Sequence, residues 1–418
     1  MSAGAGYGLR WGGGRGLIGA TMKPISALIR RAGVWGLAGA LAGSNLGWAQ
    51  TNAPVKTAWG GVHPATAPGE TTLEVSHLVP NDRLVLPGEI VGITEARVRL
   101  SPTTTRPLYW SAGAESAPAT VWLTGLHREH FPLRVEVETA AKTGQVPGGR
   151  ISLLAHEAQI QGTGARLVAA PAGEFIGDWT NRTDVVQWDY KPSRWGRYDL
   201  SLAVAGEGEA ELVVEVAGQK FTVKRPPTGG ADRYQTIPVG RLYLANEQRI
   251  SVRVAAGGAG TGLVANLKAA ILEPAPEGAD IRQTGAEPIT LPASQAITHS
   301  VTMRYEPLPN KNCLGFWVNA KDWAEWYFQL AQAGTYSAKI SLGCGKGQGG
   351  SEIEVSLDGQ TRTFLVPDTG DYHTHTWVDL GEFRLARAAD YALSVKPIKK
   401  KAGAIMDIES VVLTPVAK

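Results

Sequence analysis

Residues 315–338 read GFWVNAKDWAEWYFQLAQAGTYSA, and residues 177–200 read GDWTNRTDVVQWDYKPSRWGRYDL. The two stretches align without a gap at an offset of 138 residues. The residues they share are Gly177 and Gly315, Trp179 and Trp317, Asn181 and Asn319, Asp184 and Asp322, Trp188 and Trp326, Gly196 and Gly334, and Tyr198 and Tyr336. Self-similarity at a fixed spacing is the mark of repeated structural units. The pattern therefore indicates a duplicated domain.

The duplication continues downstream at an offset of 141, because the second copy holds additional residues near Gly345–Gly350. Further matches at this offset are Gly218 and Gly359, Gln219 and Gln360, Gly240 and Gly381, and Pro274 and Pro415. We therefore divide the chain into five segments. They are a leader (1–49), an N-terminal β domain (50–148), repeat 1 (149–276), a linker rich in Pro, Ala, Gly and Glu (277–288) and repeat 2 (289–418).

Each repeat is predicted to consist of strands. Runs such as Leu212–Val216 and Ile353–Leu357 alternate apolar and polar residues, which is the period of a half-buried strand. Asp322–Gln329 also fits a helix, but its counterpart Asp184–Lys191 is β-branched and precedes Pro192, so we assign both to strands. Roughly eight short strands per repeat indicate a two-sheet sandwich. The expected fold is all-β, with tandem jelly-roll sandwiches after an additional N-terminal β domain that shows no repeat relationship to them.

The leader predicts export. Residues 1–49 contain five basic and no acidic residues, and an apolar run at 32–46 precedes a small-residue cleavage site before Gln50. A membrane span needs about 20 apolar residues, so we expect a bacterial signal peptide starting at Met22, a secreted or periplasmic protein and no stable membrane span. Removing the leader changes the net charge from +3 to −2, which does not favour nucleic-acid binding. The basic run Lys399–Lys401 is interpreted as a solvated turn.

Repeat 2 resembles a known family of binding domains. Its GFW, DWAEW and AGTY elements and its ending GAIMDIESVVLTP (403–415) resemble family 6 carbohydrate-binding modules and their galactose-binding-like relatives. NKNCLGFW (310–317) and GCGKGQGGSE (343–352) are similar to accessory domains of secreted bacterial sulfatases and fucosidases. The resemblance implies a β-sandwich that binds a glycan.

The same resemblance implies where a sugar would stack. The family's aromatic residues lie on edge loops, and the corresponding positions are Trp317 and Trp179 in one loop and Tyr372, His373 and Tyr234 in a later one. For each of these rings, packing in the core is the alternative.

One family feature is missing. The ligand-binding Asn of the final strand is replaced by Ile405 in repeat 2 and by Val264 in repeat 1, and an apolar side chain cannot bind a sugar hydroxyl. The usual cleft is therefore expected to be empty or altered. Some relatives also hold a structural calcium, for which Glu157, Glu306 and Asp407 are the candidate ligands.

The sequence contains no catalytic motif that we recognise. G-x-S-x-G, H-E-x-x-H and P-loop patterns are absent. Cys313 and Cys344 leave a disulfide open. We therefore expect a non-catalytic protein that needs no cofactor, calcium aside, and binds extracellular polysaccharide. The alternatives are a structural protein whose sandwiches bind partner proteins, and an enzyme with an unrecognised site in residues 50–148.

Overall fold

The computed structural model describes residues 55–63, 70–87, 90, 92–111, 118–146, 148–170, 173–246 and 248–416. The described chain is all-β, as predicted, with four short 3-10 turns as its only helical elements. These turns are η1 (Pro80–Asp82), η2 (Arg128–His130), η3 (Ala155–Glu157) and η4 (Ala293–Gln295). Within the described residues, no helix is long and apolar enough to cross a membrane. The leader lies outside the described residues, so export stays a prediction.

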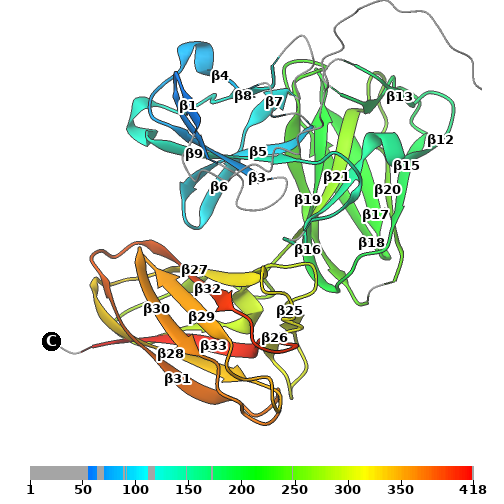
Figure 1. The fold of residues 1–418 in the computed structure, drawn as a ribbon. Coiled ribbons are helices and arrows are strands. Elements are labelled where there is room, and N and C mark those ends of the chain that lie inside the picture. The colour runs from blue at the N-terminus through cyan, green and yellow to red at the C-terminus, as the bar shows by residue number, and fades with distance from the viewer. Residues whose placement is uncertain are drawn as a thin grey trace, which may run out of the picture. The chain divides into compact units, whose positions relative to one another are not determined.

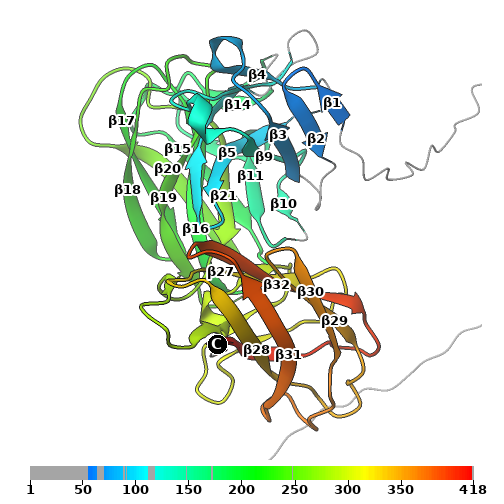
Figure 2. The ribbon, with the colours of Figure 1, turned by 90° about the vertical axis from the view of Figure 1, so that its left-hand side faces the viewer.

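The N-terminal β domain contains two sheets (Figure 2). The larger sheet has the order β1 (Val55–Thr57), β2 (Gly60–His63), β3 (Glu70–Val75), β9 (Leu133–Thr139), β5 (Ile93–Ser101) and β6 (Thr104–Pro107). The smaller sheet has the order β4 (Arg83–Val85), β8 (Thr120–Trp122) and β7 (Tyr109–Ser111).

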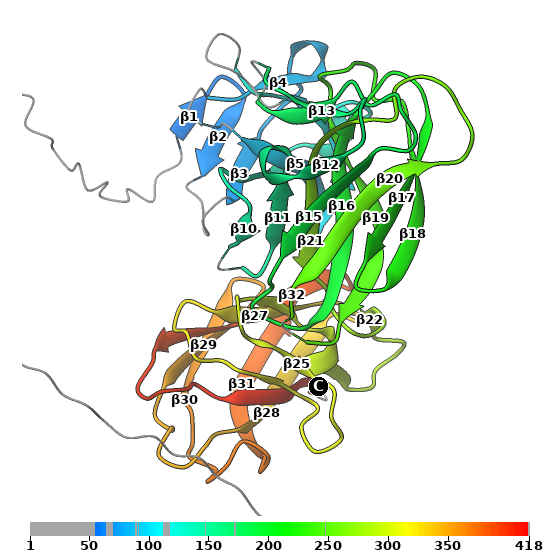
Figure 3. The ribbon, with the colours of Figure 1, turned by 90° about the vertical axis from the view of Figure 1, so that its right-hand side faces the viewer.

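Repeat 1 is a sandwich of two antiparallel sheets (Figures 1 and 3). One sheet joins β10 (Gly144–Gln145), β11 (Ile151–Leu154), β21 (Asn266–Pro274), β14 (Phe175–Gly177) and β13 (Arg166–Val168), with β16 (Gly196–Ala205) beside β21 and β19 (Gln235–Leu244) beside β16. The other has the order β12 (Gln159–Gln161), β15 (Val185–Tyr190), β20 (Ile250–Gly257), β17 (Ala210–Val216) and β18 (Gln219–Arg225).

Repeat 2 repeats this strand order (Figure 1). Its first sheet joins β23 (Ile289–Pro292), β33 (Asp407–Pro415), β26 (Cys313–Gly315) and β25 (Arg304–Glu306), with β28 (Gly334–Gly343) beside β33 and β31 (Thr376–Leu385) at the edge. Its second joins β24 (Ile297–His299), β27 (Trp323–Gln329), β32 (Asp390–Lys399), β29 (Glu352–Leu357) and β30 (Gln360–Leu365). A short strand of the expected linker, β22 (Ile281–Arg282), pairs with β27 in parallel. The linker is therefore partly built into repeat 2.

Each repeat has its own apolar core between its sheets, and a matched tryptophan anchors each core. The indole Nε1 of Trp188 donates to the carbonyl of Leu154, and that of Trp326 donates to the carbonyl of Pro292, both at 2.7 Å. A buried indole N–H without a partner would cost free energy, so each bond stabilises a ring at the same place in the two sandwiches.

A third core joins the N-terminal β domain to the outer face of repeat 1. The indole of Trp110 stacks on the ring of Tyr234 at 5.3 Å between centroids, and the two backbones exchange hydrogen bonds of 2.9 and 3.0 Å. Ala203, Ala205 and Ala269 of repeat 1 contribute small side chains to the same core. The outer face of this sheet in repeat 1 is therefore covered by protein.

Candidate functional site

Three of the five predicted ring residues are buried. Trp179 is 0% exposed, Trp317 is 1% exposed and Tyr234 is 1% exposed. Trp317 donates its Nε1 to the carbonyl of Asp322 at 3.2 Å, and Tyr234 stacks on Trp110. A sugar can stack only on a ring face that solvent reaches. For these three residues the structure shows the packing alternative.

Tyr372 and His373 lie in the loop before β31. Tyr372 is half-buried and its ring lies against Gly345, where a Cβ atom would come within 2.5 Å of it. His373 is exposed, and its backbone N–H donates to the carboxylate of Asp371 at 2.7 Å. A larger residue at position 345 would therefore collide with the Tyr372 ring in its present position. Both residues remain candidates for ligand contact.

The structure adds an exposed ring that the sequence reasoning missed. Trp377 is 54% exposed on the edge strand β31. It is paired in register with Ser341 of β28, while Ile340 and Leu342 of β28 are buried in the core. Trp377 and Ser341 therefore lie on the outer face of the sheet. The alternation of His373, His375 and Trp377 was the available signal, but it does not tell which face is solvent-exposed.

Polar side chains lie on the same sheet face as Trp377, although Ser341 itself is only 2% exposed. The Ser341 hydroxyl donates to the Glu409 carboxylate at 2.6 Å, and His375 Nδ1 lies 3.8 Å from the same carboxylate. His375 Nε2 is buried and has no hydrogen-bond partner among the described residues. Lys339, two residues before Ser341 on β28, is exposed. We call Trp377, His375, Ser341, Glu409 and Lys339 the Trp377 face.

The matching face of repeat 1 has a different chemistry. The residues that correspond to the Trp377 face are Thr236 for Trp377, Tyr234 for His375, Ala203 for Ser341, Lys268 for Glu409 and Ser201 for Lys339. In repeat 1 this face packs on the N-terminal β domain through Tyr234 and Ala203. In repeat 2 the indole of Trp377 and 39% of the Glu409 side chain stay exposed. The same sheet face thus serves packing in one repeat and is open in the other.

Two of the three predicted calcium ligands lie together. One ligand atom each from Glu306, Cys313 and Asp407 lies within 4.8 Å of the others, and all three residues are buried. Lys311 Nζ donates to both Glu306 oxygens at 2.9 Å. Burial raises the pKa of the Asp407 carboxyl to about 7, and burial also raises the pKa of the Cys313 thiol. The Lys311 ammonium therefore balances the Glu306 carboxylate, and burial favours the uncharged forms of Asp407 and Cys313.

The third predicted ligand is elsewhere. Glu157 lies in repeat 1, where its carboxylate accepts the backbone N–H of Thr143 at 3.3 Å. The group that does assemble includes a thiol, whereas calcium prefers hard oxygen ligands, and Lys311 already holds the Glu306 carboxylate. These residues do not fit calcium. The thiols of Cys313 and Cys344 are free and buried, so the disulfide left open by the sequence is not formed.

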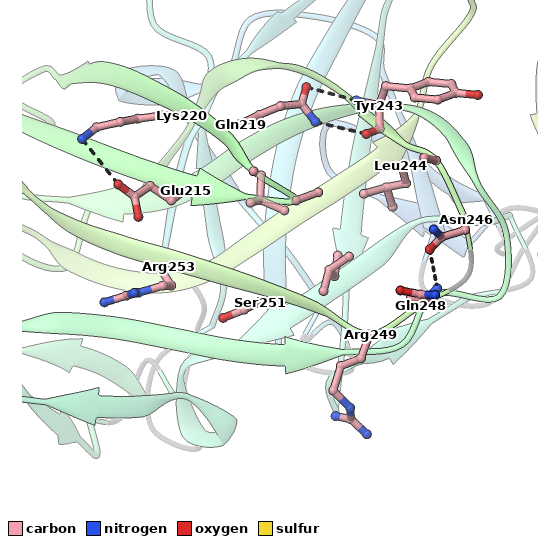
Figure 4. Close-up of a pocket in the computed structure, with 15 residues that line it drawn as sticks. Glu215, Gln219, Lys220, Tyr243, Leu244, Asn246, Gln248, Arg249, Ser251 and Arg253 are labelled. Carbon is pink, nitrogen blue, oxygen red and sulfur yellow. Dashed lines mark hydrogen bonds and ion pairs between the residues drawn. The ribbon is translucent and has the colours of Figure 1, made fainter.

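Repeat 1 has an open pocket of about 720 Å³ at the β17–β18 and β19–β20 ends (Figure 4). The Gln219 amide bonds the backbone of Tyr243 on both sides, with its Nε2 donating to the carbonyl at 3.0 Å and its Oε1 accepting the N–H at 3.4 Å. Gln360 does the same to Arg384 in repeat 2. The Tyr243 ring and the Arg249 guanidinium point away from Gln219 and Glu215 (Figure 4). The pocket offers polar groups and one ring, that of Tyr243, which is 37% exposed against 54% for Trp377 and points away from Gln219 and Glu215, so the Trp377 face is the better binding candidate.

The comparison with protein families finds one match. A family described as a domain of unknown function, DUF5077, matches residues 303–418, which lie within repeat 2. No curated protein matches the chain. The sulfatase and fucosidase resemblance stays a prediction.

Several solved structures are similar to parts of the chain. A family 35 carbohydrate-binding module from Clostridium thermocellum has 16% identity and a TM-score of 0.27, covering 30% of this chain and 98% of its own. A CBM36-1 domain of a multidomain xylanase, from the hindgut metagenome of Trinervitermes trinervoides, has 10% identity and a TM-score of 0.25, covering 30% and 98%. A Paenibacillus xanthan lyase has 12% identity and a TM-score of 0.29, covering 85% and 34%. At such identities and scores these likenesses identify no ligand.

Proposed function

We propose that this protein is exported, is not an enzyme, and binds extracellular carbohydrate through the Trp377 face of repeat 2. The observation that carries the proposal is an exposed indole on a sheet strand with a carboxylate, an imidazole and a hydroxyl beside it. The C–H face of a pyranose stacks on an indole, and carboxylate and imidazole groups bind sugar hydroxyls. The face contains both kinds of group.

The placement of these groups on strands supports binding. Ser341 and Trp377 are held by the β28–β31 ladder, and Glu409 lies on β33 next to β28. Side chains on sheet strands lose little conformational freedom when a ligand binds, so more of the contact energy appears as affinity. Under this proposal repeat 2 binds the carbohydrate, since the matching face of repeat 1 is covered by the N-terminal β domain.

Replacement of the ring tests the proposal. We expect Trp377→Ala to weaken binding by about tenfold or more, because loss of one stacking ring removes ~1–2 kcal/mol of contact. Affinity electrophoresis against a panel of plant and algal polysaccharides measures the effect. Tyr243→Ala, which removes an exposed ring from repeat 1, is the matched control and should bind as the parent does. Unchanged binding by Trp377→Ala would exclude this face.

A second function is a structural protein whose sandwiches bind partner proteins. The observation in its favour is the third core, in which the same sheet face of repeat 1 packs on another β domain. Under this alternative no polysaccharide in the panel is bound, and the Trp377 face instead buries Trp377 in a protein complex. Because the chain has 13 tryptophans, acrylamide quenching is compared for the parent and for Trp377→Phe, and protection by a partner that the variant loses would show that burial.

A further inference from the structure

Lysines gather on three loops at one end of repeat 2. Lys321 follows β26, Lys346 lies in the loop after β28, and Lys399, Lys400 and Lys401 are at the end of β32 and just beyond it. Lys321, Lys346, Lys399 and Lys401 are exposed. We call these five residues the lysine cluster.

Hydrogen bonds connect the three loops. Lys400 Nζ donates to the carbonyl of Val318 at 2.6 Å, and the backbone N–H of Ile405 donates to the carbonyl of Trp317 at 2.9 Å. The Gln348 side chain accepts the backbone N–H of Ala404 at 3.0 Å. The lysines are therefore held at one end of the sandwich although they are far apart in sequence.

The lysines of the cluster form no close ion pair with a described carboxylate. Three acidic residues lie near them. The Asp322 carboxylate, next to Lys321, accepts the Ser300 hydroxyl, Glu352 is paired in register with Lys399, and the two Asp368 oxygens accept the backbone N–H groups of Gly347 and Gly370. Exposed cations without acidic partners attract anions at low salt, and that attraction is screened as salt rises.

Repeat 1 provides an internal comparison. The residues matched to Lys399, Lys400 and Lys401 are Gly258, Ala259 and Gly260. Lys321 is matched by Thr183, and Lys346 lies among the residues that repeat 1 does not have. The positive end is therefore a feature of repeat 2 alone. It occurs in the repeat that also has the open Trp377 face.

The cluster borders the Trp377 face. The ring of Tyr372 lies against Gly345, the neighbour of Lys346, and a Cβ atom on Gly343 would come within 3.0 Å of the His375 ring. The loop that carries Lys346 therefore starts next to His375, which is a residue of the Trp377 face.

We propose that the lysine cluster binds the anionic groups of an acidic polysaccharide, carboxylate or sulfate, while Trp377 stacks on a neighbouring sugar. The inference rests on the proposed function of the Trp377 face. Duplex DNA fits less well, because its bases are already paired and stacked and offer the Trp377 indole no free face, whereas a sugar exposes a C–H face on which the indole can stack.

The experiment compares charged and neutral polymers with the whole protein. Polygalacturonate supplies carboxylates and dextran sulfate supplies sulfates, with neutral galactan and dextran as their uncharged counterparts. The test variant carries Lys346→Gln, Lys399→Gln and Lys401→Gln and keeps Lys400, which bonds Val318. The control variant carries Lys191→Gln, Lys220→Gln and Lys224→Gln, three exposed lysines of repeat 1.

We expect the test variant to bind the preferred acidic polymer about tenfold more weakly at low salt, from three lost exposed charge contacts, and neutral polymers unchanged. The control variant should match the parent. Undiminished binding of the acidic polymers by the test variant overturns the inference, as does equally tight binding of duplex DNA or phosphatidylserine vesicles by the parent. Trp377→Ala distinguishes failure of this inference from failure of the proposed function. If Trp377→Ala weakens polysaccharide binding and the lysine substitutions do not, the proposed function of the Trp377 face stands and the inference about the lysine cluster is wrong.

Discussion

Trp317 and Trp377 show how differently two tryptophans of one domain are used. Trp317 is 1% exposed and bonds the carbonyl of Asp322, whereas Trp377 is 54% exposed on an edge strand. The first stabilises the core by burying a large apolar surface. The second leaves most of its ring available to a ligand.

Asp407 gives a residue-scale prediction about pH. Burial raises its pKa from 3.8 to about 7, so the folded protein binds a proton that the unfolded chain releases over this range. The contribution of this group to the free energy of unfolding is fully present below about pH 4 and is lost as the pH rises to about 7 and beyond. Each unit of pKa difference corresponds to about 1.4 kcal/mol. Urea unfolding at pH 5 and pH 8 should show a smaller loss of stability for Asp407→Asn than for the parent.

The neighbouring Glu306 supplies the control for that measurement. Its carboxylate is held by Lys311, so Glu306→Gln leaves the half-buried Lys311 ammonium without its carboxylate partner and should destabilise the protein at both pH values. A parent protein equally stable at pH 5 and pH 8 would contradict the role given to Asp407.

At the scale of elements, the repeated Gly-Gln pair is a structural clamp. Gln219 ties the β17–β18 turn to the backbone of Tyr243, and Gln360 ties the β29–β30 turn to the backbone of Arg384. The clamp explains why these glutamines match between repeats, although the sequence did not show what they bind.

The clamp predicts equal effects in both sandwiches. Gln219→Ala and Gln360→Ala should each lower the free energy of unfolding by about 1 kcal/mol, because each removes two hydrogen bonds to backbone groups. Thermal unfolding followed by circular dichroism measures the change, with the exposed Gln159→Ala as the control. If either variant melts with the parent, the clamp in that repeat contributes nothing to stability.

On the scale of the whole molecule, one duplicated face has two uses. Repeat 1 covers it with the N-terminal β domain, and repeat 2 leaves it open with polar side chains around Trp377. A buried ion network adds to the covered side, where Arg150 Nη1 lies 2.9 Å from Glu95 and 3.7 Å from Glu138. The N-terminal β domain therefore covers this face of repeat 1 within the same chain.

The Trp110–Tyr234 stack should be essential to this arrangement. Trp110→Ala leaves a cavity in the third core, and such changes cost about 3–5 kcal/mol. Calorimetry should show an earlier transition for Trp110→Ala, while Trp377→Ala, which removes an exposed ring, should melt close to the parent. Equal melting of the two variants would mean that the third core adds little.

The duplication, the all-β class and the sandwich architecture follow from the order of the amino acids alone. Matched Gly and Trp residues fix where strands turn and pack, and the alternating runs fix their period, so Asp322–Gln329 was assigned to a strand and β27 spans Trp323–Gln329. These are local properties of the chain.

Which rings are exposed and which acidic side chains meet depends instead on how the strands and domains pack together. Alternation groups His375 with Trp377 but does not say whether that face packs, because covering depends on another domain that is distant in sequence. Glu306 and Asp407 meet because β25, β26 and β33 are neighbours in one sheet. Burial and proximity are set by contacts across the whole fold, so no local pattern could supply them.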